Sequence, residues 1–213
     1  MDWKNKIFEE KSFLSAYLKA RTVASAASNT RVSFLAFLLT LLYVLINLKS
    51  GLAYMPYESL VTTIRTIGDT GFVFTTSILG FLIAGFAIFA SVTKPELFVV
   101  LAQLPHKKSD ITQLQFVFFN FLLVFIHYIL FLAVCVAMKI GLASGGPFAG
   151  VLRLIADTEP VVITYVGSLL LALIVAWFVF LLMLLKSFVW NIYQAVLLAI
   201  AAEAELKEQA EKR

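Results

Sequence analysis

Four long apolar runs, none of which contains a charged side chain, dominate the chain. They lie at 32–48, 71–92, 114–138 and 161–185. About 20 helical residues, at 1.5 Å each, cross the hydrocarbon core of a bilayer. The last three runs reach that length. The first is short, and its ends should snorkel to the interface or the bilayer should thin around it. The pattern predicts an all-α integral membrane four-helix bundle over residues 32–185.

Composition excludes most alternatives to a membrane protein. The 213 residues are 61% hydrophobic and 14% charged, whereas soluble domains are about half apolar and about a quarter charged. Twenty Phe residues exclude a disordered chain, and a single cysteine excludes a disulfide scaffold. About thirty residues precede the first run, and no small-x-small site follows it closely, so we expect no cleaved signal peptide.

The distribution of positive charge predicts the orientation. Thirteen of the seventeen Lys and Arg residues lie before the first run, between the second and third runs, or after the fourth. Positive charge is retained on the cytoplasmic side, so both termini should be cytoplasmic. The absence of an Asn-x-Ser/Thr sequon agrees with a bacterial source. We therefore expect a multi-pass protein of the bacterial inner membrane.

The cytoplasmic parts are expected to be helical. In the N-terminal segment 1–31, residues 2–21 place aromatic and aliphatic side chains opposite lysines, which predicts an amphipathic helix that lies in the interface or packs on the protein itself. In the second loop, 97–104 predicts a short helix, and Ser109 or Asp110 should cap the third span. Lys107 and Lys108 would lie at headgroup level or in a solvated loop. Residues 186–213 contain no Gly or Pro, so the fourth helix should continue into a cytoplasmic tail.

Small residues form two ridges at helical spacing. Lipid tails provide no hydrophobic drive to pair helices, so association depends on small residues that let backbones approach closely. These ridges predict that spans two and four pack against each other or across a subunit boundary, and hydroxyl-lined pore walls are the alternative. The ridges are Ser77, Gly80, Ala84, Ala87 and Ser91 in the second span, and Thr164, Ser168, Ala172 and Ala176 in the fourth.

The third span carries a polar stripe, in which Gln113, Asn120 and His127 recur every seven residues. Polar groups within a bilayer are costly and usually face protein or water, so they are candidate functional residues. The stripe either lines a wet path or bonds a neighbouring helix, such as the one with Thr40, Tyr43 and Asn47. His127 is the one span residue expected to titrate near neutral pH.

The missing residue types argue against an enzyme. The predicted spans hold no Asp or Glu, and two histidines in the whole chain are too few for a His-based zinc site. There is no GxSxG elbow and no Walker loop. We expect no catalytic activity, no metal, no cofactor and no nucleic-acid partner.

Two functions remain. The first is an oligomeric channel or pore-type membrane effector that responds to a soluble cytoplasmic partner, which the polar stripe and small ridges favour. The second is a non-catalytic anchor or assembly subunit that docks a partner protein through its terminal helices. Both require the lipid bilayer, together with further copies or a membrane partner protein.

Overall fold

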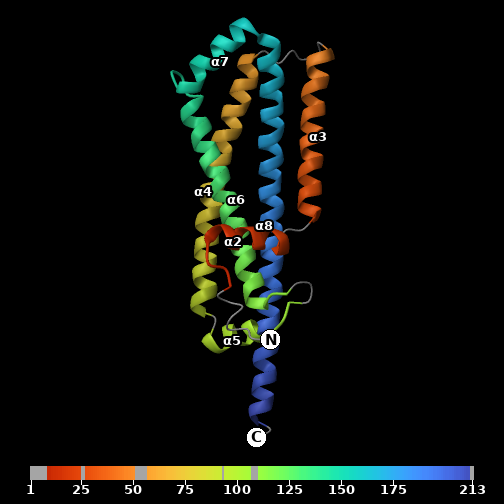
Figure 1. Cartoon of the computed structure of the whole chain (residues 1–213), viewed down its shortest axis with the longest axis vertical. Helices are drawn as coiled ribbons and strands as arrows, with labels where there is room; N and C mark the ends of the chain where they lie inside the picture. The colour runs from red at the N-terminus through yellow and green to blue at the C-terminus, as the bar shows by residue number, and fades with distance from the viewer. Residues whose placement is uncertain (1–8, 25–26, 51–56, 93, 107–109, 212–213) are drawn as a thin grey trace. The chain divides into compact units, whose positions relative to one another are not determined.

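The computed structural model describes residues 9–24, 27–50, 57–92, 94–106 and 110–211. Within these ranges every extended element is a helix, and the only β-type pairing there is an isolated bridge between Pro105 and Thr112. The all-α prediction is therefore confirmed. The helices, in chain order in Figure 1, are α2 (Phe13–Ala24), α3 (Ala27–Ser50), α4 (Tyr57–Val92), α5 (Pro95–Gln103), α6 (Gln113–Gly141), α7 (Pro147–Thr158) and α8 (Pro160–Glu211).

Four helices are long and apolar enough to cross a membrane, which confirms the number of predicted spans and suggests a membrane-embedded protein. The candidate spans are Ala27–Ile46, Ser59–Ser91, Gln113–Gly141 and Val161–Leu198. The first begins five residues before the apolar run because α3 starts at Ala27 and has no Gly or Pro before the run. With 20 residues, this span no longer needs a thinned bilayer.

The second candidate span is longer than the apolar run predicted from the sequence. Helix α4 begins at Tyr57, so Arg65 and Asp69 lie within the candidate span Ser59–Ser91. This candidate span therefore contains a carboxylate, although the apolar run 71–92 does not. The early start has a physical reason, because Leu60 and Ile64 are four residues apart and both are buried on one face. At 1.5 Å per residue, the 36 residues of α4 extend about 54 Å, well beyond a hydrocarbon core of about 30 Å.

Helix α7 was not predicted. It occupies the connection between α6 and α8, with Gly146 at its N-cap and Pro147 in its first turn. Pro has no N–H to leave unpaired at this position and its φ suits a helix, so the Gly-Pro pair was the available signal. None of its residues is buried.

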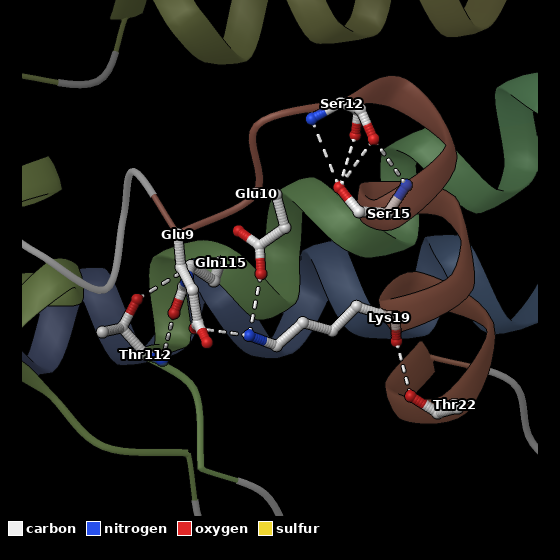
Figure 2. Close-up of polar contacts among 8 residues, drawn as sticks. All are labelled: Glu9, Glu10, Ser12, Ser15, Lys19, Thr22, Thr112 and Gln115. Atoms are coloured by element: carbon white, nitrogen blue, oxygen red, sulfur yellow. Dashed lines mark hydrogen bonds and ion pairs between the residues drawn. The ribbon is translucent and has the colours of Figure 1, made fainter.

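Helix α2 is shorter than predicted. Residues 1–8 lie outside the described residues, and Glu9 to Lys11 are not helical. The helix begins after Ser12 because Ser12 and Ser15 cap each other. The Ser15 N–H donates to Ser12 Oγ, and the Ser12 N–H donates to Ser15 Oγ, both at 3.2 Å (Figure 2). This is the capping-box arrangement with a serine in place of the usual Glu or Gln.

The cap of α6 is also corrected. Asp110 does not cap it, since the helix begins at Gln113 after Thr112. The Gln115 N–H donates to Thr112 Oγ1 at 3.2 Å, and the Thr112 N–H donates to Gln115 Oε1 at 3.0 Å (Figure 2). Ser109 lies outside the described residues. Helix α5 ends before Pro105, as predicted, with Leu104 as its C-cap.

Contacts divide the chain into two compact units. The first unit is Met1–Ala26, Phe81–Ile126 and Leu184–Arg213, and the second is Ala27–Gly80 and His127–Met183. The core of the first unit is aromatic, with Phe121 (α6) 4.8 Å from Phe86 (α4) and 4.6 Å from Phe188 (α8) between ring centroids.

The core of the second unit is built around Phe131 of α6, which is fully buried. Its ring lies 5.5 Å from Trp177 and 6.0 Å from Phe178, both of α8, between centroids. Gly71 of α4 lies against the same ring. A Cβ at Gly71 would be 2.9 Å from Phe131 Cε1 and 3.0 Å from Cys135 Sγ, so α4 and α6 approach closely because glycine stands at this position.

Candidate functional site

The candidate site of the first unit is a pair of asparagines on two apolar helices. Asn120 of α6 is 5% exposed. Its Nδ2 donates to the Phe116 carbonyl at 2.7 Å, and its Oδ1 accepts from Asn191 Nδ2 of α8 at 2.6 Å. The nitrogen of the Asn120 amide therefore bonds within its own helix, and its oxygen bonds to α8. A side-chain bond between two helices is the arrangement that polar residues provide in place of a hydrophobic drive within lipid.

In the second unit, two of the cross-helix hydrogen bonds among the described residues are donated by a hydroxyl to a backbone carbonyl of α8. Tyr128 of α6, which is fully buried, donates to the Leu181 carbonyl at 3.1 Å. Ser33 of α3 donates to the Ala176 carbonyl at 2.6 Å. Helix α8 is thus bonded to α3 and to α6 in this unit, and these hydroxyls act as helix-pairing groups.

The three residues of the predicted polar stripe have different surroundings. Asn120 pairs with Asn191 of α8. The partner helix suggested by the sequence was the one with Thr40, Tyr43 and Asn47. His127 is half-buried, and its ring centroid lies 5.2 Å from that of Phe180 at an interplanar angle of 60°. Gln113 is half-buried at the start of α6, where its N–H donates to the Leu104 carbonyl at 2.9 Å. The contacts of Asn120 favour the helix-bonding interpretation of that residue.

The two small-residue ridges differ in how far their residues are exposed. In the fourth span, Ser168, Ala172 and Ala176 are buried and Thr164 is half-buried. The second-span ridge is exposed at all five positions, Ser77, Gly80, Ala84, Ala87 and Ser91. Nothing lies within 4 Å of a Cβ built at Gly80. The exposure of the second-span ridge favours the alternative in which it packs across a subunit boundary, and this stays a prediction.

Charged groups of the second unit meet at the α4–α6 pair. Lys139 lies 3.0 Å from Asp69 and 5.4 Å from the ring centroid of Phe72. Both charged side chains are more than half exposed, so the pair adds little stability. Its role is to neutralise the carboxylate that the long helix α4 brings into a candidate span.

In the first unit, a second charged group joins α2 to the residues that precede it. Lys19 Nζ lies 2.6 Å from Glu9 and 2.8 Å from Glu10 (Figure 2). Burial lowers the pKa of Lys19, but hydrogen bonds to Glu10 and Glu9 and their negative charges outweigh it, so the pKa is raised. This stabilisation is complete below the ordinary lysine pKa and is lost as the pH rises through the raised value. Lys107 and Lys108, the predicted basic surface residues, lie outside the described residues.

Within the described ranges, no group of three His, Cys, Asp or Glu residues is placed to hold a metal ion. Comparison of the chain with protein-family models, with curated proteins and with solved structures gives no match.

Sequence reasoning missed two residues of the cross-helix bonds, Asn191 and Ser33. Both had a signal. Asn191 lies between Phe188–Trp190 and Ile192–Tyr193 of α8, and an amide among such apolar and aromatic side chains needs a partner. Ser33 is a hydroxyl at the start of an apolar run, two residues after Arg31. At that place a hydroxyl would be expected to contact the lipid headgroups and not another helix.

We expect Asn120 and Asn191 to be energetically coupled. Asn120→Leu and Asn191→Leu should each destabilise the protein, and a double-mutant cycle should give a coupling of about 0.6 kcal/mol and at most about 1.7 kcal/mol. The measurement is unfolding in mixed detergent micelles. Gln194 of α8 is exposed, so Gln194→Leu provides the control and should show no coupling to Asn120→Leu. Equal coupling in both cycles would mean that the asparagine pair has no special role.

Proposed function

We propose that the protein is a non-catalytic membrane subunit that assembles with further copies, or with another membrane protein, through the exposed ridge of α4. In this proposal it spans the bacterial inner membrane with both termini in the cytoplasm. The part of α8 beyond Leu198 and the helix α2 are the elements available to dock a soluble partner. The observation that carries the proposal is the exposure of all five ridge positions.

The location of the ridge on α4 supports assembly. The buried residue Leu82 and the ridge residue Ala84 are two positions apart, which separates them by about 160° around the helix. The ridge thus faces away from the chain's own core. A flat row of small side chains on the outer face of a span offers the close backbone approach by which helices associate in lipid.

The hydroxyls of the ridge need no water. Ser77 Oγ donates to the Val73 carbonyl at 2.9 Å, and Ser91 Oγ donates to the Ile88 carbonyl at 3.0 Å. A serine that bonds its own helix leaves no unpaired donor in a dry interface. This supports a packed contact over a wet channel wall.

An oligomeric channel or pore-type effector is the second candidate. The observation that favours it is that His127 is only half-buried, so that a path between copies could reach an imidazole. In that case, ion leak from liposomes that hold the full-length protein should depend on pH, because histidine is the side chain that changes its charge most readily in the physiological range. The dependence should disappear in His127→Phe. The assembly subunit should give no leak in either form.

Cysteine cross-linking tests the assembly proposal. The chain has one cysteine, Cys135, which is buried, so a second cysteine reports its own surroundings. We expect Ala84→Cys to form disulfide-linked dimers in membranes under mild oxidation. The matched control is Ala90→Cys, which is also exposed on α4 but lies six residues away, about 120° around the helix. Equal dimer yields would argue against the ridge, and so would the absence of any cross-link together with a monomeric mass in detergent. A cross-link to a different protein would identify the membrane partner.

A further inference from the structure

The second unit contains an apolar cavity of about 340 Å³ between α6, α7 and α8. Ala137 and Met138 line it from α6, Val151 and Leu152 from α7, and Leu170 from α8. All the other lining residues are also aliphatic or aromatic. Its volume lies at the lower end of the range for small-molecule sites, roughly 300–1,000 Å³.

Two features of the chain build this cavity. Phe148, in the first turn of α7, lies against Gly141 at the end of α6, where a Cβ would overlap the ring. This contact holds the start of α7 on α6. Beyond Phe148, α7 does not pack fully against the other helices of this unit, because Val151 lines the cavity and is still 56% exposed. The cavity is therefore open beside α7.

The surroundings of the cavity identify its occupant. Helix α7 joins two candidate membrane spans, α6 and α8, so it lies at the membrane boundary. Water is a poor occupant because an apolar lining offers it no hydrogen-bond partners. The apolar material that reaches this depth of a bilayer is the hydrocarbon chain of a lipid.

The residue pattern of α7 agrees with a lipid surface. Phe148, Val151 and Leu154 are apolar and more than half exposed, while Arg153 and Asp157 are its charged residues. Such an amphipathic helix lies in the interface with its apolar side among the acyl chains. The guanidinium of Arg153 follows directly after the lining residue Leu152 and supplies a cation at headgroup depth, where lipid phosphates lie.

We propose that this cavity binds one acyl chain of a membrane phospholipid. The chain enters beside α7 and contacts Ala137, Val151 and Leu170, and the headgroup stays in the interface. Lipid binding at this site is independent of assembly through α4, because the residues involved lie on other helices.

The test uses the full-length protein in phosphatidylcholine vesicles doped with phosphatidylcholine that carries a diazirine in one acyl chain. After irradiation, mass spectrometry should find lipid adducts enriched on Val151, Leu152 and neighbouring lining residues. Ala137→Phe adds a ring from an exposed position on α6 and should lower these adducts several-fold. Val151→Trp, also at an exposed position, fills the cavity from the other side and should do the same if Ala137→Phe fails to fold.

Leu154→Phe is the matched control. Leu154 belongs to α7, is 67% exposed and does not line the cavity, so its enlargement should leave the adducts unchanged. Three outcomes would overturn the proposal: adducts spread evenly over all exposed apolar residues, adducts on the lining that both filling variants leave unchanged, and a lining that acquires no lipid adducts.

Discussion

Replacing Phe121 with alanine should cause the largest loss of stability of any single truncation in the first unit. Phe121 is 4% exposed and its ring contacts those of Phe86, Phe89 and Phe188, with centroid distances of 4.8, 6.4 and 4.6 Å. Two of these contacts are edge-to-face, which is the favourable arrangement. Removing the ring leaves a cavity among three helices.

We expect Phe121→Ala to lower the free energy of unfolding by about 3 kcal/mol, near the lower end of the range for buried Phe→Ala changes. In lipid, the unfolded helices remain in surroundings as apolar as the core, so the free energy of transferring the Phe ring out of the core is small. The loss of stability therefore comes mostly from lost packing contacts. Unfolding in mixed micelles measures it.

Phe118→Ala is the control for Phe121→Ala. Phe118 belongs to the same helix and also contacts Phe86, at 6.2 Å, but it is 40% exposed. Its truncation should cost less than half as much. Equal losses for the two variants would show that the aromatic contacts around Phe121 do not define the core of this unit.

Replacing Gly71 with leucine should prevent the second unit from folding. A Cβ alone would lie 2.9 Å from Phe131 Cε1 and 3.0 Å from Cys135 Sγ. The Phe131 ring has little room to move, because it is fully buried and packed on Trp177 and Phe178. For Gly71→Ala we expect a loss of about 1–3 kcal/mol from overpacking, partly offset by about 1 kcal/mol of better helix propensity. The yield of monodisperse protein in detergent and its thermal unfolding measure both effects.

Gly80→Leu is the matched control on the same helix. Nothing lies within 4 Å of a Cβ at Gly80, so this variant should fold as well as the parent. If the ridge of α4 mediates assembly, Gly80→Leu should lose only the oligomer. A folded Gly71→Leu variant, or an unfolded Gly80→Leu variant, would contradict the arrangement of α4 described above.

Much of the secondary structure followed from local pattern. The lengths of the apolar runs set the number of candidate spans. The positions of Gly and Pro, which act within a few residues, set the end of α5 before Pro105 and allow α8 to continue beyond the fourth apolar run. The errors were also local. The capping pairs Ser12–Ser15 and Thr112–Gln115 shortened one predicted helix and set the start of another. The Gly-Pro start of α7 was overlooked.

The apolar runs alone predict an all-helical chain with four candidate membrane spans, because the free energy of placing a segment in lipid depends on that segment's own composition. How the helices use their polar and small residues depends on the packing of helices that are distant in sequence. The ridges of α4 and α8 look alike in sequence, yet one is exposed and the other is mostly buried. Asn120 found its partner on α8. Contacts between helices in lipid depend on shape and hydrogen bonding between surfaces distant in sequence, and no periodicity within a single helix contains that information.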